Sequence, residues 1–208
     1  NFTIEIFTFG LAFNFIKYFA FDEVGKKIII QSLITDNFKI KSVQFSYSRW
    51  KNLFTYLESA KKRDSLFCLL EEISIYRSDS KIYIVNNKRL TPDELIIEDQ
   101  CNWFNGRITV SSLPKFSKYA NKCMASLPEN FNYKVRQWKF SDTYISATSG
   151  NKRKLSDLFI DKKLNYIQKR IQPIVTDQND NILWIPGLDH ASIISNYKFK
   201  KYSWELIK

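Results

Sequence analysis

The residues best suited to chemistry in this sequence are cations that lie close together around a short apolar run. The stretch GNKRKLSDLFIDKK, residues 150–163, places three successive cations after a glycine and two more at its end. Between them, Leu155, Leu158 and Phe159 recur at helical spacing, which predicts a short helix with one buried face. Cations held beside the free N–H groups at the start of a helix favour phosphate binding. The segment therefore predicts a phosphate site rather than a catalytic one.

We expect eight cations to form a surface that binds a polyanion. Leu164, Ile167 and Ile171 predict a second short helix, which Pro173 ends. Tyr166 is the aromatic residue for which we expect contact with an unpaired base, because Trp138 and Trp184 fall in predicted strands. The expected binding residues are Lys152, Arg153, Lys154, Lys162, Lys163, Lys169, Arg170 and Arg136, with Lys134 and Lys139 on the same side.

Catalytic and metal-binding motifs are absent from the sequence. The five glycines are isolated, so they cannot build a phosphate loop, and neither G-x-S-x-G nor H-E-x-x-H occurs. Asp157 and Asp161 are four residues apart, but Arg153 lies four before Asp157 and predicts an ordinary helical ion pair. His190 is the single histidine, and we expect it to be structural or solvated. We predict no catalytic residue and no cofactor in this chain.

The three cysteines, Cys68, Cys101 and Cys123, are far apart in the sequence. This spacing predicts neither a zinc site nor a disulfide framework, so we expect reduced, buried thiols in a cytoplasmic protein.

The net charge of +11 over 208 residues lies mostly in the second half of the sequence. Residues 1–100 hold 14 Lys and Arg against 13 Asp and Glu, a net charge of +1, whereas residues 101–208 hold 18 against 8, a net charge of +10. Such a basic half favours RNA, DNA or an anionic membrane as partner. The apolar run at 2–21 contains Glu5, Asn14 and Lys17, which disfavour a membrane span or a signal peptide. We expect it to pack in a core or to dock on another surface.

The pattern of the chain predicts an α+β protein with two parts. Residues 1–68 are expected to be mainly helical, with a helix at 46–60 that places Trp50, Leu53, Phe54 and Leu57 on one face. Residues 26–35 read as a helix or a strand. Residues 69–208 are expected to form a mixed α/β domain, with strands at 74–77, 81–85, 107–110, 132–138, 174–177 and 182–185.

Three motifs in order resemble the C-terminal domain of tRNA(Ile)-lysidine synthases. They are GNKRKLSDLFIDKKL, KRIQPIV and ILWIPG, within residues 134–187. Two positions depart from the family pattern, where Ser141-Asp142-Thr143 replaces Gly-Asp-Arg and Asn165 replaces a proline. Nothing in the chain matches the S-G-G-x-D-S loop that binds ATP in the family's catalytic domain, which is consistent with a fragment, a proteolytic product or a divergent stand-alone homologue.

The resemblance implies a fold shared with a domain of the phenylalanyl-tRNA synthetase β subunit, and a role in binding tRNA(Ile). The whole enzyme uses ATP and Mg to adenylate the anticodon cytidine at C2, after which the lysine amine displaces AMP to give lysidine. By resemblance, this chain would act as the tRNA-binding part of such a cytoplasmic ligase in tRNA processing. The catalytic domain of the same enzyme and a second copy of the chain are the protein partners implied, and a membrane is not.

Two other interpretations stay open on the sequence alone. One is a non-catalytic protein that binds membrane surfaces or nucleic acids in general through its basic half, with residues 2–21 as an anchor. The other is a small enzyme with a site around Asp157 and His190, for which the sequence indicates no substrate.

Overall fold

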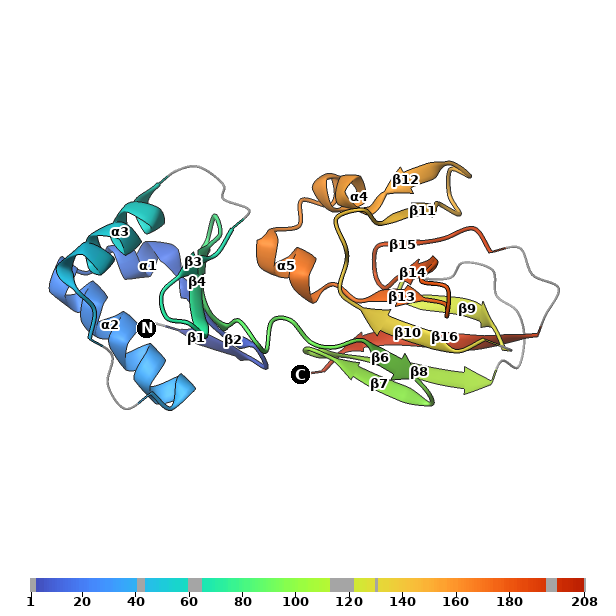
Figure 1. Cartoon of the computed structure of the whole chain (residues 1–208), viewed down its shortest axis with the longest axis horizontal. Coiled ribbons are helices and arrows are strands. Elements are labelled where there is room, and N and C mark those ends of the chain that lie inside the picture. The colour runs from blue at the N-terminus through green and yellow to red at the C-terminus, as the bar shows by residue number, and fades with distance from the viewer. Residues whose placement is uncertain are drawn as a thin grey trace. The chain divides into compact units, whose positions relative to one another are not determined.

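The computed structural model describes residues 3–40, 44–59, 65–112, 122–129, 131–193 and 198–207. The chain forms two compact units, Asn1–Leu90 and Thr91–Lys208, and Figure 1 shows the elements of each. Both units combine helices with antiparallel sheets. The expected α+β class is therefore confirmed.

The first unit is a five-stranded antiparallel sheet with three helices. Its strands run in the order β1 (Ile4–Phe7), β2 (Gly10–Asn14), β5 (Lys81–Asn86), β4 (Ile73–Arg77) and β3 (Phe67–Cys68). The helices are α1 (Phe15–Phe19), α2 (Glu23–Phe38) and α3 (Tyr47–Glu58). Side-chain oxygens of Asn14, Asp22 and Ser46 accept hydrogen bonds from the first turns of the three helices, which satisfies backbone N–H groups that a helix start leaves free.

Alternate residues of the strands in this unit form one core with the helices. Ile82 and Ile84 of β5 and Ile75 of β4 are fully buried with apolar residues of α2 and α3. Figure 1 shows the three helices on one side of the sheet. The expected face of α3 is confirmed, since Trp50, Leu53 and Leu57 are buried and Phe54 packs against the same core.

The start of the chain differs from the expected helical segment. Ile4–Phe7 and Gly10–Asn14 form a hairpin, and β2 pairs with β5 from a distant part of the sequence. Leu11 and Phe13 are buried in the core, so the middle of the apolar run packs inside this unit, in line with one of the two expectations, whereas Ile6 and Ile16 are each 73% exposed. Within the part of the chain that is described, no helix combines the length and the apolar character needed to cross a membrane.

The second unit contains two stacked sheets and a hairpin. One sheet has the order β15 (Asp189–His190), β14 (Ile182–Ile185), β13 (Ile174–Thr176), β10 (Tyr133–Arg136) and β6 (Leu95–Ile97). The other has the order β7 (Gln100–Trp103), β8 (Gly106–Ser112), β16 (Phe199–Leu206) and β9 (Met124–Pro128). The hairpin of β11 (Thr143–Ile145) and β12 (Lys152–Lys154) leads into α4 (Leu155–Asp161), which is followed by α5 (Tyr166–Ile171).

The five-stranded sheet of this unit is covered on both faces. Tyr133, Val135, Val175 and Trp184 point from it into a core shared with the four-stranded sheet. The other face contributes Ile174, Ile182 and Ile185 to a second core, with residues of β11 and α4. We call residues 143–172, which hold the hairpin, α4 and α5, the outer layer; Figure 1 shows its elements together on one side of this sheet.

The structure divides the chain later than the expected boundary, after Leu90 rather than after residue 68. The reason is that β5, assigned to the second part by sequence, pairs with β2 from the first, and β4 pairs with β5. This also changes the distribution of charge. Residues 1–90 hold 14 Lys and Arg against 9 Asp and Glu, a net charge of +5, and residues 91–208 hold 18 against 12, a net charge of +6. The second unit is therefore not a basic domain beside a neutral one.

Candidate nucleic-acid interface

The outer layer is the most basic part of the second unit. Residues 143–172 hold seven Lys and Arg against two Asp. Its helix α4 is anchored as the sequence predicts, because Leu155, Leu158 and Phe159 are at most 1% exposed in the core with β13 and β14. The indole ring of Trp138 packs edge-on against Phe159, with 5.6 Å between the ring centroids.

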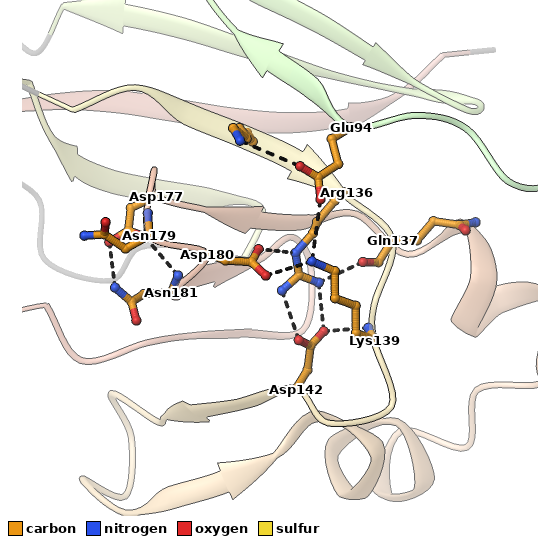
Figure 2. A network of polar contacts seen from close by, with 10 residues as sticks. Glu94, Arg136, Gln137, Lys139, Asp142, Asp177, Asn179, Asp180 and Asn181 are labelled. Carbon is orange, nitrogen blue, oxygen red and sulfur yellow. Dashed lines mark hydrogen bonds and ion pairs between the residues drawn. The ribbon is translucent and has the colours of Figure 1, made fainter.

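A buried arginine links the sheet to the start of this layer. Arg136 ends β10 and is 2% exposed. Its Nη1 and Nη2 atoms each donate to one carboxylate oxygen of Asp142 at 2.9 Å, and its Nε donates to Asp180 at 2.6 Å. Nη1 also donates to the carbonyl of Gln137 at 2.8 Å. Figure 2 shows the guanidinium between these acceptors, which come from two different loops.

The burial of Arg136 would lower its pKa, but its hydrogen bonds to Asp142 and Asp180 outweigh burial and raise the pKa. Burial would raise the pKa of Asp180, and the hydrogen bonds from Lys139 and Arg136 reverse this and lower it. Arg136 and Asp180 therefore both stay ionised across the physiological range.

Asp142 also closes a tight turn over residues 139–142. Its Oδ2 accepts from the backbone N–H of Lys139 at 2.7 Å, and its own N–H donates to the carbonyl of Lys139 at 3.0 Å. Its carbonyl accepts from the N–H of Leu155, the first residue of α4, at 3.0 Å. One residue thus joins the sheet, the turn and the start of the helix.

A second polar tether fixes the hairpin to β15. The buried carboxylate of Asp189 accepts from the hydroxyl groups of Tyr144 at 2.7 Å and Ser146 at 3.1 Å, and from the backbone N–H of His190 at 2.9 Å. Burial alone would raise the pKa of Asp189, but these hydrogen bonds lower it below its ordinary value. Tyr144 lies in β11 and Ser146 directly follows it, so Asp189 holds the first strand of the hairpin. Asp142 holds the start of α4, and the outer layer is thus tethered at two places.

Most of the expected binding residues lie in the outer layer. Lys152 and Lys154 alternate along β12 and are exposed, as are Lys162 and Lys163 directly after α4. Lys169 and Arg170 are half-buried in the last turn of α5. The structure thus brings these six cations to three consecutive elements, while their contacts with RNA remain a prediction.

Arg136 does not belong with these cations. Its guanidinium is buried and engaged by two carboxylates, so it does not present its charge to an external phosphate. The flanking Lys134 and Lys139 both form ion pairs with Glu94, at 3.7 and 3.6 Å, and Lys139 also pairs with Asp180 at 2.8 Å. The structure therefore gives no support to Arg136 as a phosphate contact, and local sequence patterns do not reveal this because Asp180 lies 44 positions away.

Two local expectations for this segment are wrong. Arg153 lies in β12 rather than in the helix, and it forms an ion pair with Asp161, not with Asp157. The start of α4 is not an open anion site either, since its first N–H already donates to Asp142 and Asp157 occupies its first turn. Side-chain charges, not the helix start, make this surface positive.

The other chemical candidates have structural partners. The Nε2 atom of His190 lies 2.7 Å from the carbonyl oxygen of Met124, and its ring stacks on Trp184. Among the residues that are described, no three His, Cys, Asp or Glu side chains come together as a metal site would require. The cysteines form no disulfide, and Cys101 is buried but Cys68 exposed, contrary to the expectation of buried thiols.

Of the aromatic residues considered from the sequence, Trp184 is buried, Trp138 is half-buried, and Tyr166 is half-buried at the start of α5. The aromatic residue that the sequence analysis missed is Phe140, in the turn closed by Asp142, which is 91% exposed. Its position between Lys139 and the Ser141-Asp142 turn pair is the one signal that the sequence offers.

A segment of the chain is similar in sequence to known enzymes. The tRNA(Ile)-lysidine synthase of Bacillus subtilis (strain 168) is 40% identical over 58 residues, which are 28% of this chain and 12% of that protein. The enzyme of Thermotoga maritima is 35% identical over 60 residues, 29% of this chain and 14% of that protein. Part of this chain is lysidine-synthase-like. The resemblance drawn from its motifs is confirmed, over a segment that covers 12 to 14% of these relatives.

A solved structure described as the TILS C-terminal domain aligns with 50% of this chain and 86% of its own chain, with a TM-score of 0.45 and 18% identity. No protein-family model matches the sequence.

Replacing Arg136 by methionine is expected to lower the free energy of unfolding of the second unit by about 3–5 kcal/mol, because Asp142 would stay buried without its partner. Urea unfolding followed by tryptophan fluorescence measures this, since four of the five tryptophans lie in this unit. The control Lys200→Met removes an exposed pair with Glu129 and should cost less than about 1 kcal/mol. Equal losses in the two variants would contradict the role given to Arg136.

Replacing Asp189 by asparagine should flatten the acid dependence of stability. The folded pKa of Asp189 is lowered, so the unfolded chain binds more protons between the folded pKa and the unfolded value of about 3.9. The resulting stability is present above the unfolded pKa and is lost as the pH falls through the folded pKa. Urea midpoints from pH 6 to pH 2 should therefore fall less steeply in D189N than in the parent chain. A slope as steep in the variant would show that Asp189 is not responsible.

Proposed function

We propose that this chain acts as the tRNA-binding part of a lysidine synthase, with the outer layer of the second unit in contact with RNA phosphates. The observation that supports this best is the concentration of seven cations against two carboxylates in a layer tethered to the sheet. The names of the matched relatives, tRNA(Ile)-lysidine synthases, identify the RNA to test first.

The tethered layer suits recognition of a folded RNA. Phosphate contacts position a protein on nucleic acid, and structured RNA is recognised largely through its shape and backbone. Both demand cations at fixed spacing, because a flexible tail loses more side-chain and backbone entropy on binding. Lys152 and Lys154 lie in β12. The hairpin that contains β12 is bonded to Asp189 through Tyr144, and α4, which follows β12, is buried in a core.

The conversion of cytidine to lysidine with ATP and lysine would belong to a catalytic domain. The residues of this chain do not fit a site for ATP and Mg, since its glycines are isolated and no S-G-G-x-D-S loop occurs. We therefore assign no catalytic step to it. Binding, and with it the orientation of tRNA(Ile), is the role proposed for these residues.

The charge reversal K152E/K154E should weaken binding to tRNA(Ile) at least about tenfold near 0.1 M salt, since two phosphate contacts are replaced by repulsion. Filter binding measures it. The matched control K51E/R89E makes the same change in net charge at exposed positions of the first unit and should change affinity much less. Equal losses would indicate a general charge effect, and no loss would rule out this surface.

The salt dependence should report the number of contacts. If about five phosphates are neutralised, the logarithm of the binding constant should fall against the logarithm of salt concentration with a slope of roughly −3 to −5. K152E/K154E should make the slope shallower by about 2. Titrations with tRNA(Ile), a DNA duplex and anionic vesicles, each over a range of salt, would separate the proposed partner from a general polyanion; equal affinity for all three would contradict a preference for tRNA.

A further inference from the structure

Phe140 is the most exposed large apolar side chain in the described part of the chain, at 91%. Most apolar side chains of the second unit lie in its two cores, and the exposed Ile145 and Ile160 of the outer layer are 52% and 64% exposed. An apolar side chain that stays in water contributes no hydrophobic stabilisation to the folded state. Folding therefore does not explain why residue 140 is a phenylalanine.

The turn that presents Phe140 is held in one conformation at its base. Two hydrogen bonds join Lys139 to Asp142 across the turn, and the Asp142 carboxylate forms a bidentate pair with the buried Arg136. Figure 2 shows Lys139 and Asp142 drawn together beside Arg136. The ring of Phe140 is therefore displayed from a fixed backbone, which reduces the entropy that a ligand must overcome on binding.

The residues that adjoin Phe140 in the sequence are polar or charged rather than apolar, and Lys139 pairs with Asp180 and Glu94. Thr143 pairs with Lys154 across the hairpin, directly after the turn, and the carbonyl of Asp142 accepts from Leu155. The side chain of Lys139, next in sequence, is half exposed. A cluster of apolar side chains would indicate a protein partner, whereas one exposed ring in the turn that leads directly into the hairpin of β11 and β12 matches an unpaired nucleotide, whose base stacks while its phosphate meets the cations of β12.

We propose that Phe140 is a stacking platform for an unpaired base of the bound RNA. This inference rests on the proposed function and adds a ligand class to it, namely single-stranded nucleotides at an end or loop of the RNA. A base within a duplex is stacked on its neighbours and does not offer its face, so Phe140 contributes nothing to binding of fully paired RNA. The stacking contact is apolar, so its contribution varies little with salt.

The test compares F140A, F140L and F140W with the parent chain in binding to a tRNA transcript and to a fully paired RNA hairpin. F140A and F140L should lose roughly 5- to 150-fold in affinity for the tRNA, the range for one stacked base, and F140W should keep it. The salt slope should not change, in contrast to K152E/K154E, and the paired hairpin should bind all four proteins alike. I160A, a change at an exposed apolar side chain of the outer layer, serves as control and should bind like the parent.

A short single-stranded RNA containing 2-aminopurine separates this inference from the proposed function. Its fluorescence should be quenched by the parent chain and by F140W, but not by F140A. If F140A binds tRNA as tightly as the parent, or F140L binds like the parent, stacking is wrong while tRNA binding stands. If tRNA is not bound but the quenching depends on Phe140, the proposed function is wrong and stacking stands. If neither RNA responds, both are wrong.

Discussion

The bidentate pair between Arg136 and Asp142 is the interaction on which the outer layer of the second unit depends. Arg136 brings a charge into a site where it is 2% exposed, and desolvation makes such a charge costly unless strong hydrogen bonds replace water. Asp142 and Asp180 provide them. The pair also has geometric consequences, since Asp142 closes the turn at 139–142 and accepts from the first N–H of α4. A buried apolar pair would fill the same space but would fix neither the turn nor the helix start.

Polar tethers and apolar packing act on different parts of this layer. Leu155, Leu158 and Phe159 attach α4 to the sheet through burial, which is strong but does not select one orientation of the preceding strands. Asp189 supplies the direction, because its carboxylate accepts from the hydroxyl groups of both Tyr144 and Ser146 and so fixes β11 against β15. Two carboxylates that lie outside the cation cluster, those of Asp142 and Asp189, therefore fix the position of the cations of β12.

Local patterns in the sequence predict much of this fold, and contacts between distant residues explain what they miss. The helix at 47–58, the hairpins of β4–β5 and β13–β14, and the buried face of α4 follow from apolar spacing and turn residues. The β1–β2 hairpin is harder to predict, because Ile4 and Ile6 alternate with polar residues in β1 but Leu11, Ala12 and Phe13 of β2 form an unbroken apolar run. Arg136 reads as one more surface cation, since its partner Asp180 is 44 positions away. For the same reason local patterns do not predict the boundary at Leu90, because β2 pairs with β5, which lies far from it in the sequence of the first unit.

The charge of the buried network decides what the surface presents to a partner. Lys134, Arg136 and Lys139 are matched by Glu94, Asp142 and Asp180, so the six charges of this network sum to zero. Arg153 is similarly matched by Asp161. The positive potential of the outer layer then arises from exposed lysines in β12 and after α4, at positions that folding does not require to be charged. Substituting those lysines therefore tests RNA binding with little disturbance of the fold. Substituting Arg136 tests the stability of the fold, because its charge is buried and paired.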